Sequence, residues 1–155
     1  MGGVAISARG LLSYVINRDN FTDIDDPNFI NQQLLELGDP EFAGNLILGL
    51  DFGMPRLTYN MRYIGEQYVA SYETFNSLQG RPPENPDYSY PSQYPETFYH
   101  NIRLDLEVDD TYGFYMGVDN LLDTLPPLGL DGTGSGSGQY DNIGRFLYAG
   151  ARFKL

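Results

Sequence analysis

Few residues of this chain have the types and spacing that catalysis or metal binding needs. It contains one histidine, His100, and no cysteine, so thiolate zinc sites and conventional histidine triads are excluded. The glycine run Gly132–Gly138 lacks the spacing and the lysine of a phosphate-binding loop. The pair Asp25 and Asp26 lacks the spaced ligands of a calcium loop. We therefore expect no catalytic centre, metal site or cofactor, and interpret His100 as an interfacial residue.

Six aromatic side chains lie in the long proline-rich stretch Glu66–Thr97. On the outside of a receptor they would offer stacking surfaces for a sugar or an aromatic siderophore, because aromatic rings bury a large area and tyrosine keeps a polar tip. The same side chains could instead pack the loop on itself or join an aromatic girdle at a membrane interface. The candidate ligand contacts are Tyr68, Tyr72, Phe75, Tyr88, Tyr90 and Tyr94.

Six segments alternate between apolar and polar residues, the period of two that predicts a β-strand with one apolar and one polar face. They are Val4–Arg18, Phe42–Phe52, Leu57–Ile64, Asn101–Asp109, Phe114–Asp119 and Gly144–Leu155. Both signs of charge occur on the polar faces, so we expect cross-strand pairing within a lumen, where unpaired charges are unfavourable. The lumen-facing candidates are Arg62, Arg103, Asp105, Glu107, Arg152 and Lys154.

Long and short connections alternate between these segments. The short ones, Gly53–Pro55 and Asp110–Gly113, predict antiparallel hairpins. The long ones are Asp19–Pro40, which could hold a short helical turn within Asn28–Leu37, Glu66–Thr97 without periodicity, and Leu121–Tyr140. Outer-membrane barrels have short periplasmic turns and longer extracellular loops. The expected fold is therefore all-β, an antiparallel up-and-down transmembrane β-barrel segment of about six strands, in one domain over residues 1–155.

The charge and the apolar runs narrow the classes of partner. The net charge is −12, from 21 acidic and 9 basic residues, which favours partners other than nucleic acid. No apolar run approaches the roughly 18 residues of a membrane-spanning helix. The amino-terminal residues lack the basic and apolar regions of a signal peptide.

Two segments near the carboxyl end carry a family resemblance. Val118–Pro127 reads Val-Asp-Asn-Leu-Leu-Asp-Thr-Leu-Pro-Pro, and Tyr140–Arg145 reads Tyr-Asp-Asn-Ile-Gly-Arg before the last amphipathic strand. This order resembles the end of TonB-dependent outer-membrane receptors, where Asn-Leu-Phe-Asp, prolines, Tyr-Asp and Gly-Arg precede the final strand. Arg18–Phe21 and Arg62–Gly65 look similar to segments further upstream. The chain departs from the pattern at two positions where the family usually has phenylalanine, Leu122 and Leu155.

The resemblance implies that the chain forms the last six strands of a 22-stranded barrel, whose plug domain, TonB box and earlier strands would lie outside this sequence. It implies the outer membrane of a Gram-negative bacterium, with lipid and lipopolysaccharide around the strands. The implied partners are TonB, the barrel-assembly machinery and a small-molecule or oligosaccharide ligand. The intact receptor would import a ferric siderophore, cobalamin or an oligosaccharide, whereas the fragment alone would be inactive. The assembly signal would be Leu147, Ala149, Ala151, Phe153 and Leu155.

Three alternatives stay open at this point. A small porin-like or adhesin-like barrel needs closure in about eight strands. An outer-membrane hydrolase needs a nucleophile and a base, with His100 as the lone histidine. A soluble β-sandwich would pack its apolar faces against each other and would need no detergent.

Overall fold

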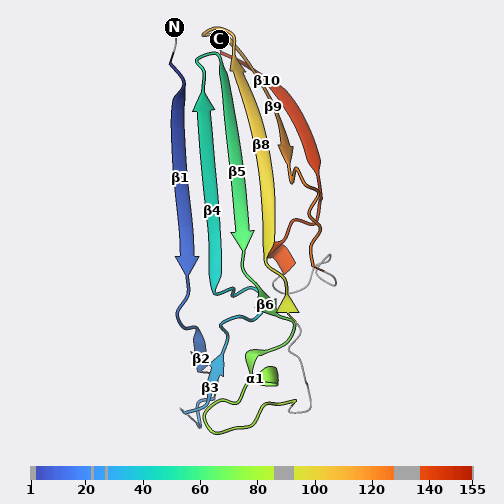
Figure 1. The fold of residues 1–155 in the computed structure, drawn as a ribbon. Helices are drawn as coiled ribbons and strands as arrows, with labels where there is room; N and C mark the ends of the chain where they lie inside the picture. Colours follow the sequence, from blue (N-terminus) through green and yellow to red (C-terminus); the bar gives the residue numbers. More distant parts are fainter. Residues whose placement is uncertain (1–2, 22, 27, 86–92, 128–136, 155) are drawn as a thin grey trace.

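Six long strands form one antiparallel sheet in the order β1, β4, β5, β8, β9, β10 (Figure 1). The computed structural model describes residues 3–21, 23–26, 28–85, 93–127 and 137–154. The strands are β1 Ala5–Tyr14, β4 Phe42–Asp51, β5 Pro55–Ile64, β8 Thr97–Glu107, β9 Tyr112–Asp119 and β10 Phe146–Phe153. The prediction of an all-β, antiparallel fold is confirmed. In the described residues the sheet is open, because β1 and β10 form its two edges and do not pair with each other.

The long connections contain regular structure that the sequence did not predict. In the first, β2 Asp19–Phe21 pairs with β3 Ile30–Gln32, so the helical turn expected within 28–37 is wrong. The local residues permit a helix, but pairing with β2 satisfies the backbone instead. In the second, β6 Gln67–Tyr68 pairs with β7 Gln93–Tyr94, and α1 spans Tyr72–Phe75. The third contains the 3-10 turn η1 Ser137–Gln139.

The strand register sorts the side chains onto two faces, because directly opposed residues on neighbouring strands point to the same side. One row across the sheet runs through Ala8, Leu48, Tyr59, Ile102, Val118 and Leu147. Positions two residues away on each strand extend this surface with mainly apolar and aromatic side chains, and we call it the apolar face. The other side, the polar face, carries most of the charged residues. The predicted alternation within each strand is confirmed by this register.

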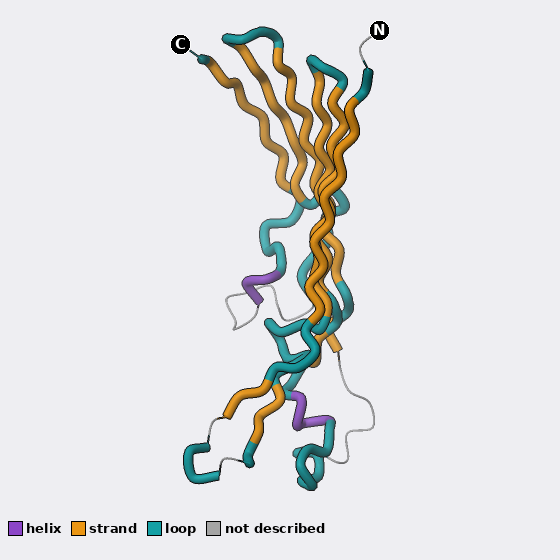
Figure 2. The backbone as a smooth tube through the Cα atoms, turned by 90° about the vertical axis from the view of Figure 1, so that its left-hand side faces the viewer, coloured by secondary structure: helices purple, strands orange, loops and turns teal. Residues whose placement is uncertain are grey.

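No described part of the chain covers the apolar face. Leu12 is 67% exposed and Leu147 is 71% exposed, and Figure 2 shows the strands as a single layer in the described part of the chain. A soluble sandwich would cover such a face with a second sheet. The buried hydrophobic residues among those described gather near the long loops, and they are Leu34, Ile64, Tyr99 and Tyr140. Among the described residues, no helix has the length and apolar character needed to cross a membrane.

The long and short connections lie at opposite ends of the sheet. Figure 1 shows the described parts of the three long loops together at one end, below the strands, and the short turns at the other end, where the chain also begins and ends. We call these the loop end and the turn end. Loop 1 is residues 15–41, loop 2 is residues 65–96 and loop 3 is residues 120–145. This arrangement places three long segments where they can contact one another.

Candidate functional site

Aromatic ring pairs border the apolar face at both ends of the sheet. At the loop end, Tyr14 stacks on Phe42 with centroids 4.7 Å apart, and Tyr63 lies 4.9 Å from Phe98. At the turn end, the ring of Tyr112 meets the ring of Phe153 edge-on at 5.7 Å. Between the two borders the face carries mainly aliphatic side chains, so the exposed surface is an apolar band with aromatic margins.

His100 lies on the apolar face close to the loop end. Its Nδ1 atom is 2.7 Å from the hydroxyl of Tyr59, and its ring stacks beside Tyr59 and Phe98 with centroids 6.0 and 6.5 Å away. The hydrogen bond pairs two polar groups on an otherwise apolar surface, where an unpaired polar group would be unfavourable. This contact gives His100 a structural role at the margin of the band.

The charged residues expected in a lumen are distributed along the polar face. The Arg103 guanidinium donates to both carboxylate oxygens of Asp105, with its Nε atom 2.9 and 3.1 Å away, and it also lies 4.5 Å from the centroid of the Tyr115 ring. Arg62 lies 4.7 Å from the centroid of the Tyr99 ring. Pairing therefore occurs within one strand and with aromatic rings, in addition to the expected pairing between strands.

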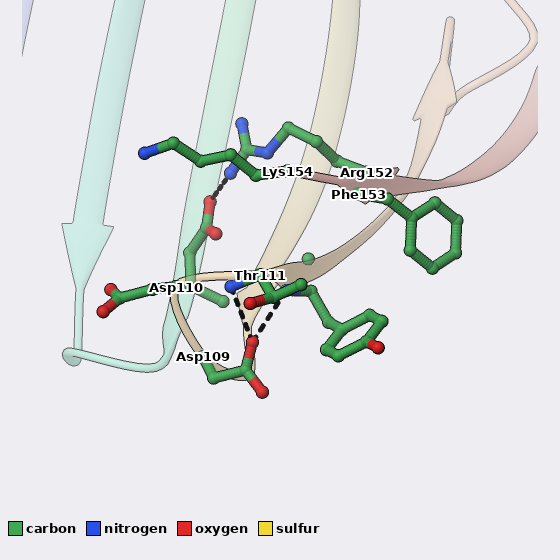
Figure 3. Close-up of a pocket in the computed structure, with 9 residues that line it drawn as sticks. Asp109, Asp110, Thr111, Arg152, Phe153 and Lys154 are labelled. Atoms are coloured by element: carbon green, nitrogen blue, oxygen red, sulfur yellow. Dashed lines mark hydrogen bonds and ion pairs between the residues drawn. The ribbon is translucent and has the colours of Figure 1, made fainter.

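A second ion pair spans three strands beside a hollow of about 660 Å³ at the turn end (Figure 3). Arg152 on β10 reaches over Gly113 on β9 to pair with Glu107 on β8. A Cβ at Gly113 would lie 3.1 Å from the Glu107 carboxylate, so the glycine leaves room for the pair. The Asp109 carboxylate accepts two backbone N–H groups of the turn, each at 2.7 Å. The backbone N–H of Lys154 donates to the carbonyl of Thr111 in this turn at 3.0 Å, which joins the end of β10 to the turn.

Tyrosine and glycine interlock between the last two strands on the polar face. Tyr148 is directly opposite Gly117, and Tyr115 is directly opposite Gly150. Each ring lies over the facing glycine so closely that an added Cβ would overlap with the ring. This arrangement fixes the register of β9 and β10, because a slip of one residue would remove both contacts. Both strands contain the sequence Tyr-x-Gly. This pattern predicts the contacts only when the register of the two strands is known.

The two segments that carry the family resemblance are joined by hydrogen bonds. Asn120 is fully buried, and its side chain bonds the backbone N–H and C=O of Thr124 at 2.8 and 2.9 Å. The Asp123 carboxylate accepts the backbone N–H of Arg145 at 2.8 Å, and the Arg145 side chain donates to the carbonyl of Leu121. Asn120 and Asp123 both have positive φ, which asparagine and aspartate adopt more readily than most residues. Asn120, Asp123 and Arg145 therefore stabilise the turn that follows β9 through hydrogen bonds to its backbone and to the backbone directly before β10.

The aromatic ligand candidates of loop 2 fall into two groups. Tyr68 lies 5.7 Å from Tyr72 and 5.3 Å from Phe75, between ring centroids, and all three are half-buried. Tyr94 instead packs against a buried cluster of Ile64, Tyr99 and Tyr140, as does Leu37. Tyr88 and Tyr90 lie outside the described residues. Of the predicted ligand contacts, Tyr68, Tyr72 and Phe75 therefore form one aromatic group. These rings are partly exposed and partly packed against one another.

Three titratable groups in the described parts of the loops have shifted pKa values. Burial raises the pKa of the Tyr140 and Tyr72 hydroxyls. Burial also raises the pKa of the Glu36 carboxyl, with smaller contributions from the negative charges of Glu73 and Asp39, against the lowering effect of its hydrogen bond from Tyr72. The loops therefore favour neutral forms of these groups.

Residues of the predicted assembly signal lie on the apolar face of an edge strand. Leu147, Ala149, Ala151 and Phe153 alternate along β10, which pairs with β9, whereas Leu155 lies outside the described residues. Among the residues that the structure describes, no group of three or more His, Cys, Asp or Glu side chains could hold a metal ion. Comparison of the chain with protein-family models, curated proteins and solved structures gave no match.

Proposed function

We propose that this chain is a wall segment of an outer-membrane β-barrel, with its apolar face on lipid, its polar face on the lumen and its long loops outside the cell. The observation that carries the proposal is the apolar band, which crosses all six strands, has aromatic margins and has no covering layer in the described residues. Water-exposed bands of this extent are rare on soluble monomers, and lipid is the solvent that makes them stable.

The height of the band supports a membrane setting. Phe42 at the start of β4 and Phe52, the residue directly after β4, mark the margins and are ten positions apart. At a rise of about 3.4 Å per residue this is roughly 34 Å along the strand. A strand tilted by about 40° projects that length onto about 26 Å of bilayer normal, close to the apolar band of about 25 Å in outer-membrane barrels.

Within the outer-membrane barrels, we favour a TonB-dependent receptor. The open edges β1 and β10 suit a sheet that continues into further strands, and the Asn120, Asp123 and Arg145 network gives a structural reason for the residues that carry the resemblance. The intact receptor would take up a ferric siderophore, cobalamin or an oligosaccharide through TonB. This segment would contribute barrel wall, outer loops and the strand that the assembly machinery reads.

A spin-label scan tests the membrane setting. The chain has no cysteine, so single cysteines at successive positions from Asn101 to Glu107 can be labelled without a background, and the protein refolded in phosphatidylcholine vesicles. We expect oxygen accessibility to peak at Ile102, Leu104 and Leu106, and accessibility to a water-soluble nickel complex to peak at the positions between them. High nickel accessibility on both faces would contradict the proposal.

The genomic context tests the receptor class separately. We expect the reading frame upstream of the Met1 codon to encode a plug domain and about sixteen further strands, the number that completes a 22-stranded transporter. A stop codon directly before the Met1 codon, together with the expected lipid accessibility of the strands, would favour a small porin-like or adhesin-like barrel instead.

A further inference from the structure

Gln67 connects the three long loops through one buried side chain. It lies in β6 of loop 2 and is fully buried. Its Oε1 atom accepts the backbone N–H of Gly38 in loop 1 at 2.6 Å and the side-chain amide of Gln139 in loop 3 at 2.8 Å. Its Nε2 atom donates to the hydroxyl of Tyr140 in loop 3 at 2.8 Å. A single amide therefore bonds both neighbouring loops.

The Gln67 side chain lies beside a buried hydrophobic cluster, where hydrogen bonds contribute more to stability than they do at the surface. The buried cluster beside the loops contains Ile64, Tyr99 and Tyr140, with Leu37 of loop 1 and Tyr94 of loop 2 packed against it. In such a dry environment, a polar group that loses its partner carries the full penalty of desolvation. Removal of the Gln67 amide would take one hydrogen bond from the buried Tyr140 hydroxyl of loop 3 and one from the Gly38 backbone N–H of loop 1.

Loops 1 and 2 are fastened to each other independently of Gln67. The Glu73 carboxylate accepts the backbone N–H of Gln32 at 2.8 Å, and the Glu36 carboxylate accepts that of Tyr72 at 3.1 Å. The backbone N–H of Tyr68 also donates to the carbonyl of loop 1 residue Leu35 at 2.6 Å. Loop 3 is instead bonded to β8. The Asp141 backbone N–H donates to the Tyr99 hydroxyl at 3.1 Å, and the backbone N–H groups of Leu121 and Asn120 donate to the His100 carbonyl and the Asn101 side chain at 2.7 and 2.8 Å. Among the described residues, the hydrogen bonds that join loop 3 to another loop are those of Gln67.

We propose that Gln67 is a positioning residue that joins the three long loops into one preorganised body. The aromatic group of loop 2 and the end of loop 3 then keep a fixed separation, and a ligand that contacts both would bind without first ordering them. The role in ligand binding rests on the proposed function, whereas the linkage between the loops follows from the hydrogen bonds alone. Loops that carry a recognition surface gain affinity from such preorganisation, because ordering them on binding is unfavourable.

The test compares Gln67→Met with Gln67→Glu in the full chain. Methionine has a similar length but forms no comparable hydrogen bonds, whereas glutamate keeps oxygen acceptors for Gly38 and Gln139 and can accept from the Tyr140 hydroxyl. One pair of spin labels, at Asp25 of loop 1 and Ile143 of loop 3, reports the separation of the loops. A second pair, at Met54 and Asp110, reports the turn end of the sheet. All four labelled positions are exposed.

We expect Gln67→Met to broaden the loop 1 to loop 3 distance distribution and to lower the hydrogen-exchange protection of the Gly38 amide by about ten- to a hundredfold. The sheet pair should stay narrow, and Gln67→Glu should restore the loop distances. An unchanged loop distribution in Gln67→Met would overturn the inference. Equal broadening of both label pairs would also overturn it, because Gln67 would then support the whole fold. Vesicle accessibility of β8 is measured separately, so failure of the membrane proposal is distinguishable from either result.

Tyr140→Phe provides a second variant that keeps the buried ring. It removes the hydroxyl that accepts from the Gln67 Nε2 atom but leaves the bonds of the Oε1 atom to Gly38 and Gln139 in place. We expect a broader loop 1 to loop 3 distribution with unchanged protection of the Gly38 amide. Loss of Gly38 protection in this variant would contradict the separate contributions assigned to the two bonds.

Discussion

Arginine substitutions at Leu48 and Ile47 separate a lipid-facing surface from a water-facing one. The two residues are neighbours near the middle of β4, and each is 37% exposed. Leu48 lies on the apolar face, opposite Ala8 and Tyr59, whereas Ile47 lies on the polar face. If solvent exposure alone mattered, arginine would cause the same loss of stability at both positions. A bilayer against the apolar face predicts different effects.

The expected magnitudes follow from the surroundings of each position. An arginine on the lipid face near the bilayer midplane destabilises a barrel by about 2–4 kcal/mol, which lowers the folding equilibrium constant about 30- to 900-fold. At position 47 the guanidinium would enter the polar face, opposite Arg9 and Asn60. Repulsion from Arg9 limits the expected loss there to about 1 kcal/mol, because exposed charge pairs interact weakly.

The assay is denaturant unfolding of the chain in phosphatidylcholine vesicles. The protein has 13 tyrosines and no tryptophan, so tyrosine fluorescence and circular dichroism follow the transition. Leu48→Arg should lose at least 1 kcal/mol more stability than Ile47→Arg in lipid. Equal losses, or a larger loss for Ile47→Arg, would refute the assignment of the apolar face to the membrane.

Three further substitutions test other parts of the structure. Gly117→Ala should destabilise the protein by about 1–3 kcal/mol, because the new methyl group overlaps with the Tyr148 ring. Arg152→Gln should lower stability by less than about 1 kcal/mol, because the ion pair with Glu107 is more than half exposed at both side chains. Glu36→Gln should raise the free energy of unfolding at pH 7. Burial raises the pKa of Glu36 in the folded state above the ordinary value of 4.5, so its contribution to stability is largest below that pH and is lost as the pH rises.

Each of these changes has an internal control. Gly10→Ala adds a methyl group with no atom within 4 Å, and a loss as large as that of Gly117→Ala would argue against the ring contact. Molar salt should abolish the effect of Arg152→Gln, because it screens exposed charges. Glu36→Gln should differ little from the original protein at pH 4, where the carboxyl is largely protonated, and an equal gain at both pH values would exclude titration as its cause.

The faces of the sheet were predictable because alternation is a local property of a strand. Ile102, Leu104 and Leu106 alternate with Arg103 and Asp105 in the sequence, and the register places the two sets on opposite sides. The alternation predicts a strand that begins at Asn101, whereas β8 begins four residues earlier, at Thr97. Thr97 to His100 pair with Met61 to Ile64 on β5, but aromatic residues on both sides of the strand concealed the alternation there.

The loop contacts were not predictable, because they join residues far apart in the sequence. Gln67 bonds Tyr140 across 73 positions, and neither residue belongs to a periodic segment. In loop 1, Asn-Gln-Gln-Leu-Leu-Glu-Leu suggested a helical turn, but pairing with Asp19–Phe21 made the first part a strand. Three residues after β3, Leu35 has a left-handed φ of 72°, which a regular helix does not contain. Local propensity is a weak guide wherever tertiary hydrogen bonds can outweigh it.

The central claim is that the apolar face spans a bilayer, and the depth of spin labels along β4 measures this most directly. Labels at Phe42, Leu46, Leu48 and Phe52 in vesicles should give a depth profile with its maximum at Leu46 and Leu48 and shallow values at both phenylalanine positions. A flat profile, or depth that increases steadily from one end of the strand to the other, would contradict a transmembrane wall.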